Sequence, residues 1–203
     1  MNIINISVPR EIEYISEWKE FNYPQGHLIL DKTICGCGFT EYCLCNNIPT
    51  VLCSPRKTLL ENKEQQHNVG DNPEYPIYYF RNEIEESKKY DNSGDLQNTI
   101  VDNIDNLSNE YKSNYIKSIK QDLINYLNTT TKTPKIIVTY DSLHYVLDVL
   151  GDSVREFAIV TDEFQSIFMD AAFKADVELD FVDDLKKCPN VLYLSATPML
   201  EKY

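Results

Sequence analysis

Two adjacent carboxylates are the residues of this sequence best suited to chemistry. Asp162 and Glu163 come shortly after an apolar run, residues 157–160. One carboxylate of such a pair can hold Mg²⁺, while the other orients and deprotonates an attacking water. We expect Asp162 in the first role and Glu163 in the second, with Gln165 sensing a terminal phosphate. The alternative is an acidic helix start, where carboxylates favour the positive end of the helix dipole.

A glycine-rich segment follows another apolar run. Residues 31–40 read DKTICGCGFT and come directly after residues 27–30. A phosphate-binding loop ends in Gly-Lys-Ser/Thr, and its backbone N–H groups surround the phosphates while its Lys contacts the outer ones. Here the triplet is Gly-Phe-Thr, so Thr40 keeps a magnesium-binding hydroxyl but Phe39 supplies no charge. The residues predicted to contact a nucleotide are Thr33, Gly36, Cys37, Gly38, Phe39 and Thr40.

Lys32 is the predicted replacement for the missing lysine, because it stands at the start of the same segment. Without a replacement cation, hydrolysis should slow by orders of magnitude, since charge stabilisation dominates phosphoryl transfer. A tight strand–helix turn that binds no ligand is the alternative for this segment.

Short hydroxyl side chains follow a third apolar run, residues 191–194. Ser195 and Thr197 would couple the acidic pair to a neighbouring lobe. An ordinary capped turn, with Pro198 at the start of a helix, is the alternative. The order of the three segments, each at the end of an apolar run, favours a shared nucleotide site.

Apolar runs alternate with helical patterns along the chain. The predicted strands lie at residues 27–30, 50–54, 77–80, 136–140, 157–160 and 191–194. The predicted helices lie at about residues 12–18, 39–46, after 55, 143–150 and 171–187. This alternation predicts an α/β fold with a mostly parallel sheet covered on both faces. Ligands of such sheets bind at the carboxyl ends of the strands, where all three segments fall.

Residues 81–133 differ in composition from the rest. Residues 81–110 contain eight acidic and three basic side chains, and apolar residues recur further along at three- and four-residue steps. This pattern predicts one or two amphipathic helices. We therefore expect one domain, residues 1–203, with an acidic helical insertion at 81–133. The insertion is either a solvated excursion or a docking surface for a partner.

Charge and cysteine content narrow the function further. The 203 residues carry a formal net charge of −13, which disfavours tight nucleic-acid binding by this chain alone. We see no apolar signal segment and no run approaching about 18 apolar residues, so we expect a cytoplasmic protein with no membrane partner.

The Cys-x-Cys pairs at 35/37 and 43/45 are spaced more closely than structural zinc sites usually are. Buried thiols are therefore expected rather than zinc ligands.

Taken together, the segments resemble the motifs of superfamily 2 (DEAD/DEAH-like) helicases over nearly the whole chain. Residues 33–40 look like motif I, 54–58 like motif Ia, 138–143 like the segment that follows it, 162–165 like motif II and 195–197 like motif III. The variant first motif is similar to that of helicase-like proteins carried by tailed phages and their bacterial hosts.

The resemblance implies the first RecA-like lobe of a P-loop NTPase, with ATP and Mg²⁺ as cofactors. It implies a nucleic-acid-dependent ATP hydrolase once a second lobe completes it, and nucleic-acid contacts through Arg56, Lys57, Thr139 and Ser142. Because the sequence ends at Tyr203, we expect a second RecA-like lobe or protein partner from elsewhere. The location would be the host cytoplasm, or the phage particle if the protein is phage-encoded.

Two other functions fit the same residues. A degenerate lobe could serve as a structural or packaging component of a phage particle, which the missing lysine and the acidic charge favour. A fragment of a DNA-packaging motor also fits a variant phosphate loop, but the sequence lacks the clustered carboxylates of the nuclease domain that such motors carry.

Overall fold

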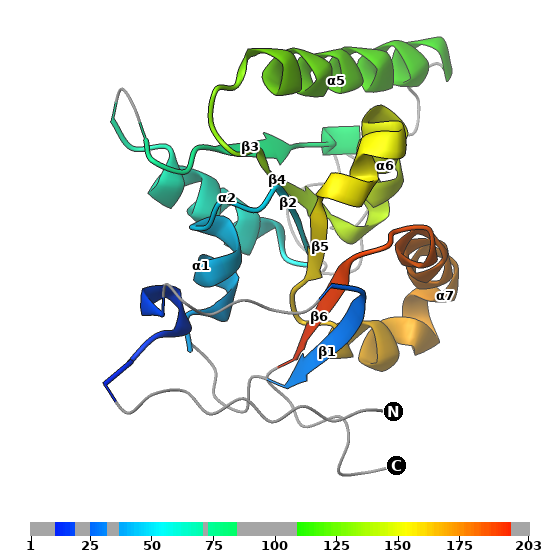
Figure 1. Cartoon of the computed structure of the whole chain (residues 1–203). Coiled ribbons are helices and arrows are strands. Elements are labelled where there is room, and N and C mark those ends of the chain that lie inside the picture. Colours follow the sequence, from blue (N-terminus) through cyan, green and yellow to red (C-terminus); the bar gives the residue numbers. More distant parts are fainter. Residues whose placement is uncertain (1–10, 19–24, 32–36, 71–72, 85–108, 196–203) are drawn as a thin grey trace, which may run out of the picture.

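A single sheet forms the centre of the molecule. The computed structural model describes residues 11–18, 25–31, 37–70, 73–84 and 109–195 (Figure 1). The strands are β1 (His27–Asp31), β2 (Thr50–Ser54), β3 (Ile77–Phe80), β4 (Lys135–Thr139), β5 (Ala158–Thr161) and β6 (Val191–Ser195). They form a six-stranded sheet in the order β1-β6-β5-β2-β4-β3. Every strand pairing described is parallel, which confirms the predicted α/β class.

The central strands are buried on both faces. All five residues of β2 and all five of β4 are buried. Val51 and Cys53 belong to one apolar core, and Leu52 between them belongs to the other. Alternate side chains of a strand point to opposite faces, so a sheet covered on both sides needs an uninterrupted apolar run.

Helices cover both faces of this sheet. They are α1 (Phe39–Leu44), α2 (Lys57–His67), α5 (Asn109–Thr129), α6 (Leu143–Leu150) and α7 (Gln165–Lys186). Figure 1 shows α1 and α2 on one side of the sheet and α6 and α7 on the other. Phe39 and Leu60 fill the core under the first pair, while Leu123, Val146 and Phe181 fill the opposite core. Among the described residues, no helix is both long enough and apolar enough to cross a membrane.

Two helices differ from the sequence prediction. Helix α7 begins at Gln165, earlier than the predicted residue 171, because the loop after β5 turns straight into it: the Ser166 N–H donates to the Glu163 carbonyl at 2.8 Å. The predicted helix near the N-terminus is only one 3₁₀ turn, η1 (Ile15–Glu17). Its Ile15 N–H donates to the Cys37 carbonyl at 2.9 Å, which fixes this turn against the glycine-rich segment. The predicted insertion helix is present as α5, while residues 85–108 lie outside the described part.

A buried lysine joins the sheet to the end of α1. Lys135 has no exposed surface, and its Nζ donates to the carbonyls of Cys43 at 2.9 Å and Ile48 at 2.7 Å. It also donates to Asn46 Oδ1 at 2.8 Å. These acceptors surround the C-terminal end of α1, where helix carbonyls have no partner within the helix. Burial lowers the pKa of Lys135 to about 8, so the ammonium form persists at neutral pH.

Replacing Lys135 with Met should destabilise the protein by about 3 kcal/mol, because several buried acceptors lose their donor together. Urea unfolding followed by circular dichroism measures the difference. Lys132→Met is the matched control, since Lys132 is exposed, and it should change stability by less than about 0.5 kcal/mol. Equal effects of the two substitutions would contradict this role for Lys135.

Candidate functional site

The three predicted segments meet at one edge of the sheet. Strands β1, β6 and β5 are consecutive neighbours, with Asp31 opposite Ser195 and Thr161 opposite Tyr193. Because all strands run in the same direction, the loops after them leave from the same edge. The sheet therefore brings the turn before α1, the loop after β5 and the end of β6 together.

One hydrogen bond joins the first two segments directly. Thr40 Oγ1 donates to Asp162 Oδ2 at 2.9 Å, although 122 positions separate the two residues. Asp162 is only 4% exposed. The predicted proximity of the glycine-rich turn and the acidic pair is thus confirmed. A hydroxyl and a carboxylate at this distance are the oxygen donors that Mg²⁺ prefers.

The backbone around Asp162 is fixed by two further hydrogen bonds. Its N–H donates to the Cys53 carbonyl at 2.9 Å, and its carbonyl accepts from the Tyr140 hydroxyl at 2.6 Å. Burial raises the pKa of Tyr140, so this hydroxyl keeps its proton at neutral pH. The Tyr140 ring is stacked on Phe181 at 4.0 Å between centroids. The backbone of Asp162 is consequently fixed by β2 and by Tyr140, and Tyr140 is in turn held against Phe181 of α7.

Glu163 has an unusual backbone conformation. Its φ of 58° places a non-glycine residue in the left-handed region, which costs energy and is concentrated at functional sites. Its N–H donates to Asp162 Oδ1 at 3.1 Å, which compensates part of that cost. The Glu163 side chain is 23% exposed and forms an ion pair with Arg56, whose Nε lies 2.8 Å from Oε2. Arg56 comes from the segment just before α2, so this pair links two of the predicted motifs.

The turn before α1 is closely covered by the η1 segment. Gly38 has a φ of 78° and serves as the N-cap of α1. A Cβ added to it would lie 3.0 Å from Tyr14 Cβ and 3.1 Å from Ser16 Oγ. Glycine is therefore required here both for its conformation and for the close approach of η1.

Phe39 occupies the place where a phosphate-binding loop has lysine. Its side chain is 1% exposed and belongs to the apolar core under α1. The ring lies 5.6 Å from the ring of Tyr42, between centroids. The aromatic side chain thus stabilises the packing of α1 on the sheet, and it brings no charge to the turn.

An open pocket of about 380 Å³ lies beside Thr40 and Asp162. Tyr14 and Ser16 of the η1 region form one side, and Lys63 of α2 lines it as well. Lys63 Nζ lies 2.6 Å from Glu41 Oε2, and His67 and Lys63 together lower the pKa of Glu41 to about 2. Sequence reasoning missed these lining residues, because nothing in their spacing relates α2 or η1 to the turn.

The other predicted residues are less closely associated with the pocket. Thr139 and Ser142 are buried, and their hydroxyl oxygens have no hydrogen-bond partner within the described structure. Lys57 Nζ lies 3.9 Å from Glu61 on the same helix, and Ser195 is buried at the end of β6. Gln165 starts α7, and its Oε1 is buried without a partner among the described residues.

Four predicted site residues lie outside the described part: Lys32, Thr33, Gly36 and Thr197.

Comparison of the chain with protein-family models, with curated proteins and with solved structures finds no match. The functional argument therefore depends on the site itself.

Gly38→Ala should destabilise the protein by about 1 kcal/mol more than Gly70→Ala. Both glycines have similar positive φ, 78° and 81°, so the two substitutions share the same backbone strain. Only at Gly38 does the new Cβ meet other atoms, whereas nothing lies within 4 Å at Gly70. Thermal unfolding of both variants measures the difference. Equal melting temperatures would mean that η1 does not rest on the turn.

Proposed function

We propose that this chain binds a magnesium–nucleoside triphosphate at the carboxyl edge of its sheet and hydrolyses it, as a helicase-like ATPase lobe with a RecA-like fold. The observation that carries the proposal is the 2.9 Å hydrogen bond between Thr40 and Asp162. In a metal-loaded site, both oxygens would turn to the same Mg²⁺, as in the strand–turn–helix sites that bind phosphates.

The surroundings of this pair support a phosphate ligand. Gly38 provides a turn with a left-handed conformation directly before α1, and the pocket beside it is within the size range of small-molecule sites. Glu163 stands next to the proposed metal ligand, at the edge where a water would approach a terminal phosphate. In this arrangement Asp162 holds the metal and Glu163 is the general base.

An ATPase needs a positive charge near the outer phosphates, and the usual lysine of the loop is absent here. Lys32 remains the predicted cation. Lys63 is a cation among the described pocket residues, and its bond to Glu41 holds it at the wall of the pocket. Either ammonium would take the place of the lysine that Phe39 replaces, and Lys32→Ala and Lys63→Ala would distinguish them.

The second candidate function is a lobe without turnover that serves as a structural component. The observation that favours it is the burial of Phe39 in the core, because the position that holds lysine in a phosphate-binding loop is then used for packing and supplies no charge. Such a lobe would retain the fold and a protein partner, and it would release no phosphate above background.

Asp162→Asn should weaken magnesium-dependent ATP binding at least tenfold, because it removes the charged metal ligand. Glu163→Gln should leave binding intact and reduce phosphate release at least about 100-fold, because only the base is lost. Isothermal titration calorimetry with ATP and Mg²⁺, and a phosphate-release assay, measure the two effects.

Asp183→Asn is the matched control, because Asp183 is 65% exposed on α7 and lies outside the pocket. It should behave as wild type. Absence of binding by wild type at millimolar ATP and Mg²⁺ would refute the proposal. Binding without hydrolysis would favour the structural alternative.

The ion pair between Arg56 and Glu163 gives the proposed activity a link to nucleic acid. The Arg56 guanidinium occupies one oxygen of the Glu163 carboxylate, which is then less available to orient and deprotonate a water. Arg56 is 67% exposed, so the pair is worth no more than about 1 kcal/mol, or a factor of about five in population. A nucleic-acid phosphate that attracts Arg56 would release Glu163 and speed hydrolysis.

Arg56→Gln should therefore raise phosphate release up to about fivefold without nucleic acid, and it should remove most of the stimulation by single-stranded DNA or RNA. Steady-state assays with and without each strand test this. Arg155→Gln is the matched control, because it removes the same charge from a residue that lies before β5, at the amino ends of the strands and away from the proposed site. Unchanged stimulation in Arg56→Gln would exclude this link.

A further inference from the structure

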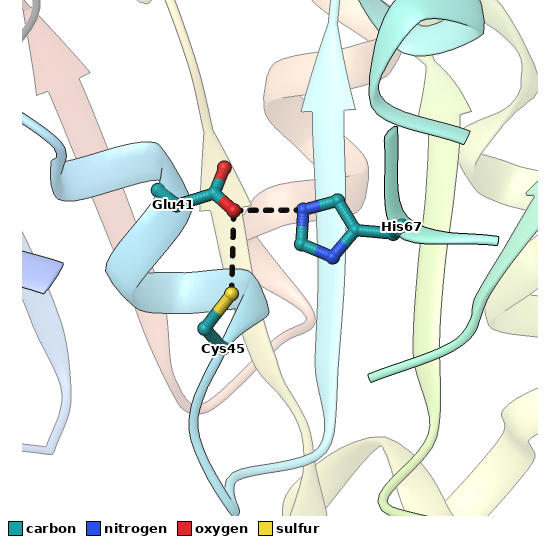
Figure 2. A group of neighbouring side chains, drawn as sticks. All are labelled: Glu41, Cys45 and His67. Atoms are coloured by element: carbon teal, nitrogen blue, oxygen red, sulfur yellow. Dashed lines mark hydrogen bonds and ion pairs between the residues drawn. The ribbon is translucent and has the colours of Figure 1, made fainter. Parts of the chain in front are cut away.

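A second group of polar side chains lies between α1 and α2. Glu41 lies on α1, Cys45 is the residue that caps its C-terminal end four positions later, and His67 is the last residue of α2. Figure 2 shows the three side chains pointing toward one another across the space between the helices. A carboxylate oxygen, a thiol sulfur and an imidazole nitrogen all lie within 4.8 Å of one another.

Glu41 Oε1 is the centre of this group. Cys45 Sγ donates to it at 3.3 Å, and His67 Nε2 lies 3.0 Å from it. Ligand atoms on a tetrahedral zinc ion are separated by roughly 3.3–3.6 Å, given bonds of about 2.0 Å to oxygen or nitrogen and about 2.3 Å to sulfur. The two separations from Glu41 Oε1, 3.3 Å and 3.0 Å, are therefore close to those between metal ligands, and the sulfur and nitrogen lie within 4.8 Å of each other.

The imidazole of His67 provides an independent observation. Its side chain is 7% exposed, and Nε2 is buried without an aligned hydrogen bond in the described structure. A buried imidazole nitrogen and a carboxylate oxygen at this distance, with no hydrogen bond aligned between them, can both act as metal ligands. A cation between the two atoms would satisfy the lone pairs of both.

We propose that Glu41, Cys45 and His67 bind a Zn²⁺ ion that joins α1 to α2. The donor set combines nitrogen, oxygen and sulfur, which suits zinc better than magnesium or calcium. One carboxylate and one thiolate balance the two positive charges. On binding, Cys45 gives up its thiol proton to solvent, and a water takes the fourth position.

Lys63 supports the ligand without competing for the same oxygen. Its Nζ lies 2.6 Å from Glu41 Oε2, so the carboxylate is held with Oε1 directed at Cys45 and His67. Hydrogen bonds of this kind to the outer atom of a ligand fix its orientation and are typical of protein metal sites. Glu41 and Lys63 also line the pocket beside Thr40, so the ion would stiffen the wall of the proposed nucleotide site.

Cobalt substitution tests this site directly. The whole protein, reduced and stripped with chelator, is titrated with Co²⁺, and a thiolate-to-cobalt charge-transfer band is expected in the near ultraviolet. Cys45→Ser should remove the band, and His67→Gln should weaken Co²⁺ binding at least tenfold. Cys37→Ser is the matched control, because Cys37 is a free, partly exposed thiol outside the group, and it should retain the band.

Zinc should displace the cobalt and raise the melting temperature of wild type but not of His67→Gln. Melting without metal shows that each variant is folded. A missing band in wild type, or the same band in Cys45→Ser, would overturn the proposal. The outcome is independent of nucleotide binding, because no ATP is present in these measurements.

Discussion

The buried carboxylate of Asp162 is the constraint on which the site depends. A charge removed from water is tolerated only where hydrogen bonds replace its hydration. Here the replacement comes from Thr40 Oγ1 and from the Glu163 N–H, while Tyr140 and Cys53 fix the backbone of the same residue. These contacts come from α1, β2 and the region after β4, so the side chain and backbone of one residue together join three parts of the fold.

Much of the fold could be predicted because its signals are local. All six apolar runs form strands, and their alternation with helical patterns is sufficient to predict a parallel sheet. The expectation that the run at residues 27–30 is a buried strand was wrong: Ile29 of β1 is 44% exposed, because β1 lies at a border of the sheet. The proximity of Thr40 and Asp162 also followed, because both belong to segments that follow the carboxyl ends of parallel strands. The strand order was beyond prediction, since it depends on which crossover packs best and leaves no pattern in the sequence.

The parts that escaped prediction are those in which distant helices meet. Nothing in the spacing of Glu41 and Lys63 shows that α2 packs beside α1, and the 2.6 Å contact between them is visible only in three dimensions. The same holds for Arg56 and Glu163, whose ion pair connects two segments that were given separate roles. Side-chain partners across an interface depend on helix position to within an ångström, whereas apolar periodicity fixes only which face is buried.

The position of β1 has a consequence for how the molecule opens. In the part of the chain that the structure describes, β1 pairs with β6 alone and forms one border of the sheet. Regions held by few contacts unfold locally long before the whole domain does. The strand that leads into the glycine-rich turn can therefore detach while the layers around β2 and β4 stay intact, and its amide protons would exchange with solvent early.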